Sequence, residues 1–419
     1  MIFKEEQKTQ PIERSEVWEA FKRVKAGGKS PGIDGVTIEA VAGNPRKYLY
    51  PVWNRLASGS YYPPAVRQAE IPKGDGTMRV LGIPTVTDRV AQMVIKQKLE
   101  KLADKHFSAN SFGYRPNLSA HDAIERCRIN CLRYSWVIDL DIKGFFDNID
   151  HDLMMLAVKR FTSEKCILMY VERWLKAPVR LLDGTLKESN GRGTPQGGVI
   201  SPLLANIFLH FAFDLWMEKH FSDNVFERYA DDIIIHCNRF KEANRVLKAV
   251  GKRLEECKLS LHPTKTKIVY CYNNQKRQVP MKLVNKSFDF LGYTFMPRIV
   301  KARGVLCIGF SPGISKKSQK RINEVFFKLK IHRWTHLTIG EIAEFLKAQT
   351  RGWINYFGKF RKTEMRNLFR CLNFRLSHWV RNRYRRFWKR PRSYAYNWLV
   401  NVSKAFPSLF VHWEHGFLP

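Results

Sequence analysis

Two adjacent aspartates, Asp231 and Asp232, are the residues of this chain with the most specific chemistry. They follow Tyr229 and Ala230 and precede three isoleucines at 233–235, a β-branched run typical of a buried strand. Two carboxylates this close repel each other, so either one pKa rises or a cation binds between them. We therefore expect a divalent metal ion at this position, held against the phosphate of a polyanion.

A second acidic segment lies upstream, at residues 135–142. Its residues alternate as in a half-buried strand, which puts Asp139 and Asp141 on the same face. The alternation offers both carboxylates and does not choose between them. Two metal ions about 4 Å apart need carboxylates from at least two chain segments, as in nucleotidyl transfer. Mg²⁺ suits this chemistry because it keeps water ligands and accepts substrate oxygens.

Two further segments have the composition of phosphate-binding elements. Residues 191–198 form a glycine-rich loop whose backbone can approach a ligand closely, because glycine lacks a Cβ atom. Residues 71–80 predict two short strands around a Gly-Asp-Gly turn, with Lys73 and Arg79 on either side of it. The alternatives for this pair are two solvated cations on a surface hairpin, or two cations poised over a triphosphate.

The charge of the chain favours a polyanionic partner. Lys and Arg number 72 against 38 Asp and Glu in 419 residues, which gives a formal net charge of +34. Such an excess attracts nucleic acids at long range and says nothing about fold. Residues 366–413 contain eleven basic residues and no acidic one, interleaved with aromatic residues, so we expect this stretch to follow a phosphate backbone.

The elements that must position these residues follow from periodicity and turn signals. Helices are expected up to about residue 70, at 87–102, from about 150, from about 202, at 241–257 and throughout the region after about 311. Residues 288–295 predict one strand with a glycine at its midpoint. Asp183-Gly184 predicts a hairpin, and Thr338 with Glu341 predicts a helix-opening capping box.

The eight cysteines do not predict a zinc site. Cys127 and Cys131 are one helical turn apart, but no second pair or neighbouring His completes a tetrahedral set. The charged N-terminus does not resemble a signal peptide, and no run of about twenty residues is apolar enough to span a bilayer. We expect a soluble protein of the bacterial cytoplasm, without a membrane partner and associated with the nucleoid when bound to DNA.

The motifs resemble, in their order, those of a group II intron reverse transcriptase, or maturase. The matching segments lie between about residues 30 and 360: Ile71-Pro72-Lys73 with Arg79, Ser111-Phe112-Gly113-Tyr114-Arg115, residues 141–147, residues 193–198, residues 229–232, Phe290-Leu291-Gly292-Tyr293, and residues 351–357. Each motif alone is loose, but their order is specific. The resemblance implies an α+β fold of the right-hand polymerase type, with fingers, a palm containing an antiparallel sheet, and a helical thumb.

The resemblance also implies boundaries. Residues 1–120 would hold an N-terminal extension and the fingers, and residues 121–311 the palm with part of the fingers. Residues 312–391 would form the thumb, or maturase (X) domain, and residues 392–419 a short basic DNA-binding segment. Longer members carry a cysteine-pair and histidine endonuclease module, which we do not expect here. Priming would then use an existing DNA end, such as one at a replication fork.

Roles at the metal site follow from the resemblance. Asp141, rather than Asp139, matches the first metal ligand of the family, and Ile142 beside it belongs to the same ligand set. Asp231 and Asp232 match the other two carboxylates. The three aspartates would be catalytic, binding two Mg²⁺ ions or Mn²⁺ as a substitute.

The resemblance assigns the nucleotide and primer contacts as well. Phe146 matches a steric gate that excludes a ribose 2′-hydroxyl and so favours deoxynucleotides. Lys265 is a weaker match for a triphosphate contact, since Lys267 competes for the alignment. The remaining assignments are the triphosphate cations Lys73 and Arg79, the nucleotide loop Pro195 and Gln196, the primer grip Leu291, Gly292 and Tyr293, and the nucleic-acid contacts Arg351, Arg381, Arg383, Arg385 and Arg386.

The function that the resemblance implies is RNA-directed DNA synthesis from deoxynucleoside triphosphates. The partners would be the group II intron RNA, an RNA template and a DNA primer or target, with splicing and retrohoming assisted by RNA binding. Two alternatives stay open: a maturase acting mainly as an RNA-folding cofactor, and a domesticated relative in DNA repair or phage defence. Retron and diversity-generating enzymes fit less well, because residues 196–198 and 351–357 resemble the intron family. The sequence does not define an oligomeric state.

Overall fold

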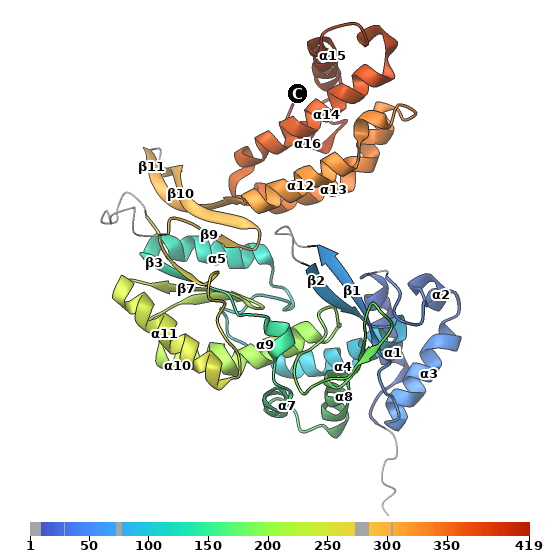
Figure 1. Ribbon diagram of the computed structural model, residues 1–419, viewed down its shortest axis with the longest axis vertical. Helices are drawn as coiled ribbons and strands as arrows, with labels where there is room; N and C mark the ends of the chain where they lie inside the picture. The colour runs from blue at the N-terminus through green and yellow to red at the C-terminus, as the bar shows by residue number, and fades with distance from the viewer. Residues whose placement is uncertain (1–9, 29, 73–77, 273–284, 303–304) are drawn as a thin grey trace, which may run out of the picture. The chain divides into compact units, whose positions relative to one another are not determined.

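The computed structural model describes residues 10–28, 30–72, 78–272, 285–302 and 305–419 (Figure 1). The chain forms two compact units. The first comprises Met1–Asn130 and Trp136–Ile268, and the second comprises Cys131–Ser135 and Val269–Pro419. The finer boundaries expected at residues 120, 311 and 391 stay predictions. Among the described residues, no helix has both the length and the apolar character needed to cross a membrane.

A four-stranded sheet has the order β6-β7-β3-β8, with β6, β7 and β3 in the first unit and β8 beginning there and ending in the second. Its strands are β6 (Phe226–Tyr229), β7 (Asp232–Cys237), β3 (Trp136–Leu140) and β8 (Lys267–Tyr270). β7 runs antiparallel to both β3 and β6. Val137 and Ile138 point to opposite faces, yet both are fully buried. The strand β3 is therefore covered on both faces rather than half-buried as predicted.

Helices cover this sheet by packing their apolar faces against it, so that the three isoleucines of β7 are buried. α11 (Phe240–Glu256) packs on β3 and β7 through Ala243, Val246 and Val250, which are buried. It begins one residue before the predicted helix. The helices between residues 120 and 220 that belong with this sheet are α5 (Ala120–Arg133), α6 (Phe145–Asn148), α7 (His151–Lys159), α9 (Ser201–Leu209), the π-helical turn η2 (His210–Asp214) and α10 (Leu215–His220).

A second sheet of the first unit has the order β2-β1-β4-β5. Its strands are β1 (Val66–Pro72), β2 (Met78–Ile83), β4 (Val179–Arg180) and β5 (Leu186–Lys187). The hairpin predicted at Asp183-Gly184 joins β4 to β5 and is confirmed. The surrounding helices are α1 (Arg14–Lys25), α2 (Ile38–Gly43), α3 (Pro45–Ser58), α4 (Val86–Ala103), η1 (Asp104–His106) and α8 (Lys165–Leu175).

The positions of Lys73 and Arg79 on either side of the turn suggest that the two face each other across the hairpin of β1 and β2. Its register places Ile71, rather than Lys73, opposite Arg79. Lys73 lies outside the described residues. Arg79 is exposed on β2, so its guanidinium is accessible to a ligand.

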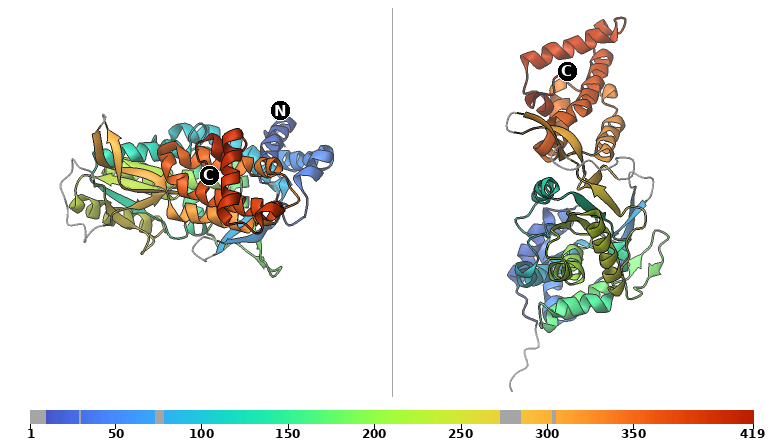
Figure 2. Two further views of the ribbon diagram at one scale, coloured as in Figure 1. Left: turned by 90° about the horizontal axis from the view of Figure 1, so that it is seen from above. Right: turned by 90° about the vertical axis from the view of Figure 1, so that its left-hand side faces the viewer.

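The second unit joins a three-stranded sheet to a helical bundle (Figure 2). The strands are β9 (Phe288–Phe290), β10 (Tyr293–Ala302) and β11 (Val305–Ile314), in the order β11-β10-β9. The helices are α12 (Lys316–Lys328), η3 (Ile331–Arg333), α13 (Ile339–Arg361), η4 (Lys362–Met365), α14 (Arg366–Arg383), η5 (Arg385–Phe387), α15 (Arg392–Ala405) and α16 (Val411–Glu414). The capping box of Thr338 and Glu341 is confirmed at the start of α13.

The single strand predicted at 288–295 is wrong. A two-residue turn at Leu291 and Gly292 divides it into β9 and β10, with Phe290 paired to Tyr293. Both turn residues have positive φ, +50° and +80°, which suits the primed turns that close two-residue hairpins. A leucine is rarely left-handed, so the sequence showed only the glycine.

Asn373 of α14 forms hydrogen bonds that hold residues 412–417 against the helical bundle. Its Oδ1 atom accepts a hydrogen bond of 2.9 Å from the indole nitrogen of Trp413 and lies 2.7 Å from His412 Nε2. Its amide nitrogen donates to the Phe417 carbonyl at 3.0 Å. Of the aromatic residues in the basic stretch, Trp379 is buried in this core whereas Trp388 is exposed.

Candidate catalytic site

The first unit brings Asp141, Asp231 and Asp232 together at one end of its central sheet. Leu140 pairs with Ile233, so Asp141 continues β3 directly opposite Asp232. Asp231 lies in the two-residue turn between β6 and β7, since Tyr229 pairs with Asp232. The topology thus selects Asp141 as the partner of the two adjacent aspartates.

The electrostatics of the three carboxylates reflect this proximity. Desolvation by the surrounding protein raises the pKa of Asp232 to about 7. The negative charges of Asp231 and then Asp141 contribute to the same rise. Burial, and then the charge of Asp141, also raises the pKa of Asp231. Asp232 nevertheless keeps an exposed edge, so a ligand can reach it. Carboxylates that repel each other in this way are stabilised by a bound cation.

The backbone of Ile142 can add a further oxygen. Ile142 forms an antiparallel bridge with Leu261, but the hydrogen bonds run between flanking residues, from Lys143 N to Ser260 O and from His262 N to Asp141 O. In such a pair the central carbonyl points away from the partner strand, here to the side of β7. Carboxylate and carbonyl oxygens are the ligands that Mg²⁺ prefers, so this donor set fits the expected ion.

Two lysines divide between the two candidate aspartates. Lys265 Nζ lies 3.6 Å from Asp141 Oδ2, and Lys267 Nζ lies 3.6 Å from Asp139 Oδ2. Lys265 and Arg79 also lower the pKa of Asp232, against the larger effects that raise it. The prediction that favoured Lys265 over Lys267 therefore has a geometric counterpart.

The glycine-rich loop lies directly against β2. Gly82 N donates a hydrogen bond of 2.7 Å to the Gln196 carbonyl. A Cβ atom at Gly197 would lie 2.6 Å from the Gly82 carbonyl, and its φ of +117° also requires glycine. Pro195 Cβ would lie 3.0 Å from a Cβ at Gly82. The loop with Pro195 and Gln196 is thus joined to the strand that carries Arg79.

Phe146 is held by the same loop. It lies in α6, and its carbonyl accepts a hydrogen bond of 2.8 Å from Thr194 N. Its ring packs edge-on against buried Phe145, with 5.3 Å between ring centroids, and is itself half-buried. The position is compatible with a gate beside the loop.

Sequence reasoning missed the buried support of this loop. Gln92 Oε1 accepts a hydrogen bond of 2.7 Å from Val199 N, and Gln92 Nε2 donates to Asp88 at 2.9 Å. Asp88 also accepts from Tyr61 and Trp174, each at 2.8 Å, and its burial raises its pKa. The available signal was two polar residues spaced i, i+4 on the apolar face of α4.

Tyr114 lies beside the tyrosine that precedes the two adjacent aspartates. Its ring lies 5.9 Å from that of Tyr229. Burial first, and then the charges of Tyr229 and Asp231, raise the pKa of its phenol. Its side chain remains half exposed, so its hydroxyl can meet a ligand at the carboxylates.

Residues 291–293, the expected primer contacts, form the turn between β9 and β10 and the first residue of β10, all in the second unit. The Leu291 carbonyl accepts a hydrogen bond of 2.9 Å from the Tyr356 hydroxyl, and the Tyr293 hydroxyl bonds to the Tyr356 carbonyl. The Gly292 carbonyl accepts a bond of 3.0 Å from Ser318 Oγ. The turn is therefore fixed to α12 and α13 of its own unit.

The arginines assigned to nucleic-acid binding lie in the second unit too. Arg351 is exposed on α13. Arg381 and Arg383 donate to the carbonyls of Trp388 and Thr335 at 3.1 and 2.7 Å. Exposed Arg385 and Arg386 lie over the rings of Trp388 and Phe387. The four arginines between residues 381 and 386 are thus oriented by contacts within their own unit.

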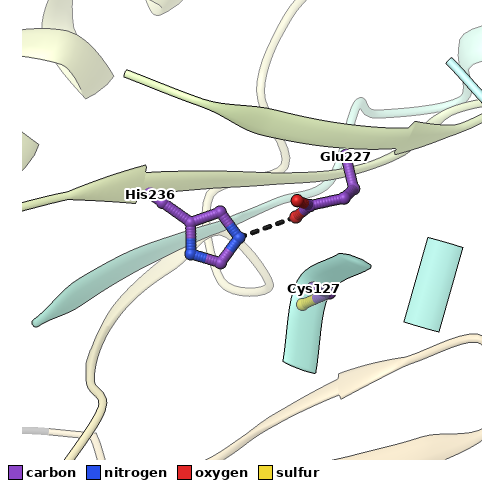
Figure 3. A group of neighbouring side chains, drawn as sticks. All are labelled: Cys127, Glu227 and His236. Carbon is purple, nitrogen blue, oxygen red and sulfur yellow. Dashed lines mark hydrogen bonds and ion pairs between the residues drawn. The ribbon is translucent and has the colours of Figure 1, made fainter. Parts of the chain in front are cut away.

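A second group of potential metal ligands was not expected from sequence spacing. Cys127, Glu227 and His236 bring one ligand atom each to within 4.8 Å of the others (Figure 3). Glu227 already accepts hydrogen bonds from His236 Nε2 at 2.6 Å and Asn130 Nδ2 at 2.5 Å, one on each oxygen. Both oxygens have protein partners, so we assign no metal to this group.

Two families match the chain. The family described as Reverse transcriptase (RNA-dependent DNA polymerase) matches residues 71–295, more than half of the chain. The family described as Group II intron, maturase-specific domain, matches residues 320–396. The first match contains the three aspartates, and the second lies within the helical bundle.

Curated relatives show similarity over part of their length. Protein YkfC of Escherichia coli (strain K12) is 34% identical over 200 residues, 46% of this chain and 52% of that protein. The COX1/OXI3 intron 1 protein of Saccharomyces cerevisiae is 30% identical over 282 residues, 65% of this chain and 32% of that protein. Group II intron-encoded protein LtrA of Lactococcus lactis subsp. cremoris is 29% identical over 255 residues, 60% of this chain and 41% of that protein. The chain thus spans about a third to a half of the length of these relatives.

Proposed function

Because this chain belongs to the reverse transcriptase family and carries a group II intron maturase-specific domain, we propose that it is an RNA-directed DNA polymerase encoded by a group II intron. It extends a DNA primer on an RNA template with deoxynucleoside triphosphates. The observation that supports this most is the meeting of Asp141, Asp231 and Asp232 beside the Arg79 strand and the Gln196 loop. Two of these carboxylates have raised pKa values, as expected of a site that awaits cations.

In this proposal the oxygens of Asp141, Ile142, Asp231 and Asp232 are the metal ligands. Two Mg²⁺ ions held there, or Mn²⁺ in their place, would supply the Lewis acidity that nucleotidyl transfer needs. The protein does the positioning: the carboxylates meet on a rigid sheet edge, and the turn that carries Asp231 leaves Asp232 accessible.

The neighbouring residues select and hold the nucleotide. Arg79 and Lys265, with Lys73, neutralise the triphosphate, whose negative charge grows toward the transition state. The loop of Pro195 and Gln196 lies beside the nucleotide. The ring of Phe146 occupies the space that a ribose 2′-hydroxyl would need and so favours deoxynucleotides.

The second unit supplies the grip on nucleic acid. Leu291, Gly292 and Tyr293 hold the primer end, and the exposed arginines around Trp388 bind phosphate. The intron RNA is the proposed partner, bound to assist its splicing and its retrohoming into target DNA. The proposed location is the bacterial cytoplasm, with association to the nucleoid when DNA is bound.

Primer extension on a defined RNA template tests the proposal. Asp231→Ala and Asp232→Ala should each abolish extension with Mg²⁺ while RNA affinity stays close to that of the wild type. Asp139→Ala is the matched control for Asp141→Ala, since both aspartates lie on one face and each pairs with one lysine. Extension that survives in both the Asp231 and Asp232 variants contradicts the site, as does equal loss in the Asp139 and Asp141 variants.

Sequencing of the RNA that co-purifies from the native locus tests the intron partner. Enrichment of a folded ribozyme that surrounds the reading frame is expected. Recovery of miscellaneous cellular RNA alone would contradict the maturase role and leave the polymerase chemistry in place.

A further inference from the structure

The strand β6 carries two adjacent charged side chains that are both fully buried, Glu227 and Arg228. Neighbouring residues of a strand point to opposite faces of the sheet. Glu227 is hydrogen-bonded to His236 on one face (Figure 3), and it also accepts a hydrogen bond from Asn130. Arg228 forms a bidentate pair with Asp214 on the other, with distances of 2.7 and 2.6 Å.

The two charges differ in their relation to the catalytic turn. Arg228 Nη1 donates to Asn206 Oδ1 at 2.9 Å and to the Ala230 carbonyl at 3.2 Å. Ala230 is the first residue of the turn that carries Asp231, and its φ of +56° is one that alanine rarely adopts. The guanidinium thus holds the backbone at the strained position of the turn.

The partners of Arg228 are themselves fixed. Asp214 is fully buried at the end of the π-helical turn η2, and Asn206 is fully buried in α9. Asn206 Nδ2 donates to the Gly113 carbonyl at 2.7 Å. A Cβ atom at Gly113 would lie 2.5 Å from Ala230 N. The backbone of Gly113 therefore packs directly against the turn.

Charge burial alone does not account for this arrangement. A buried ion pair contributes little net stability compared with well-packed apolar residues of the same volume. An apolar side chain cannot donate a hydrogen bond to the Ala230 carbonyl, whereas the planar fork of arginine binds Asp214 and this carbonyl at once. The distinctive contribution of Arg228 is therefore geometric.

We propose that Arg228 is a positioning residue: held by Asp214 and Asn206, it fixes the Ala230 carbonyl and so sets Asp231 and Asp232 for metal binding. This inference rests on the proposed function for its kinetic consequence. Its structural consequence, the alignment of the carboxylates, is independent of turnover.

The experiment compares Arg228→Lys with Glu227→Gln in the full chain. Both are conservative changes of a fully buried, hydrogen-bonded charge on the same strand, but only Arg228 contacts the turn. Two quantities are measured at a temperature where both variants are folded: Mn²⁺ binding, followed by the electron paramagnetic resonance of free Mn²⁺, and primer extension as a function of Mg²⁺ concentration. The Mn²⁺ bound at the site is defined as the part lost in Asp141→Asn.

Arg228→Lys should weaken Mn²⁺ binding and lower kcat by about 10–100-fold, the range found when residues that orient metal ligands are changed. Its KM for deoxynucleotides and its RNA affinity should stay near the wild type. Glu227→Gln should keep the Mn²⁺ affinity and the Mg²⁺ midpoint of the wild type. If Arg228→Lys does not fold, the double variant Asp214→Leu/Arg228→Met replaces it, because it leaves no unpaired buried charge.

Equal effects of the Arg228 and Glu227 variants on Mn²⁺ binding would overturn the inference, as would an Arg228 variant with wild-type affinity. A wild-type chain that binds Mn²⁺ but extends no primer would refute the proposed reaction. In that case the Mn²⁺ comparison still decides whether Arg228 positions the carboxylates.

Discussion

The ammonium group of Lys265 lies 3.6 Å from the carboxylate of Asp141. Lys265 follows Leu261, the residue that forms a backbone bridge with Ile142. The pair of Lys265 and Asp141 is partly exposed, so it contributes little to stability. Its position at the proposed metal site gives it a different importance, because in the proposed reaction an entering triphosphate would meet this cation.

Lys265→Ala should therefore lower kcat/KM for deoxynucleotides by about tenfold or more, equivalent to about 1.4 kcal/mol, while the melting temperature stays unchanged. Steady-state extension with one nucleotide measures the effect. Lys267→Ala is the matched control, since Lys267 pairs with Asp139 and not with the site. A larger loss in the Lys267 variant would reverse the assignment.

Phe146→Ala should admit ribonucleotides, because the ring is the bulk expected to exclude the 2′-hydroxyl. The measurement is the ratio of kcat/KM for a deoxynucleotide to that for its ribonucleotide, which should fall by about tenfold or more. Phe146→Tyr keeps the ring and should keep the ratio. Unchanged sugar selectivity in the alanine variant would remove Phe146 from the gate.

Gly292→Ala should destabilise the second unit by about 1–2 kcal/mol, the cost of a left-handed conformation for a residue with a Cβ atom. Its φ is +80°, and a Cβ atom there would lie 3.1 Å from Ser318 Oγ. Gly352→Ala is the control: it lies within α13 with nothing within 4 Å of its Cβ position. That change should stabilise the helix by up to about 1 kcal/mol. Chemical denaturation would measure both, and equal effects would contradict the turn geometry.

His412 should make stability depend on pH. Its burial lowers its pKa to about 3, below the usual value of 6.5, so the folded protein keeps it neutral. The unfolded chain gains a proton as pH falls below 6.5, and stability is lost between about pH 6.5 and 3, by about 1.4 kcal/mol per pH unit. Above pH 7 His412 is neutral in both the folded and the unfolded chain, so it should not contribute to the pH dependence of stability.

Thermal unfolding of the wild type and His412→Gln at pH 7 and pH 5 checks this prediction. The Gln amide can still donate to Asn373 Oδ1, the partner of His412. The variant should lose less stability than the wild type on acidification. A parallel loss in both proteins would show that other groups dominate.

The order of the motifs and the alternation of 135–142 were enough to predict the sheet and its acidic edge. The alternation could not choose between Asp139 and Asp141, because residues of one strand face share the same periodicity, and it was the resemblance that favoured Asp141. The choice depends on register, which pairs Leu140 with Ile233 and so extends β3 by one residue to meet Asp232.

Other features depend on contacts between distant segments and leave little trace in the chain. In the sequence, Arg228 precedes the acidic turn and looks like another surface cation. In the structure it is fully buried and hydrogen-bonded to Asp214 and Asn206. The turn at Leu291 was hidden because leucine rarely has a positive φ. Cys127 meets Glu227 and His236 only after α5 packs on the sheet.

The hydrogen bond from Gly82 N to the Gln196 carbonyl has a mechanical meaning. Gly197 lies against the carbonyl of the same Gly82 with no room for a side chain, so the loop contacts the hairpin of β1 and β2 at two backbone positions. A displacement of the strand that carries Arg79 would therefore disturb Gln196 as well, unless this hydrogen bond breaks. The positions of Arg79 and Gln196 are thus coupled through the backbone of Gly82.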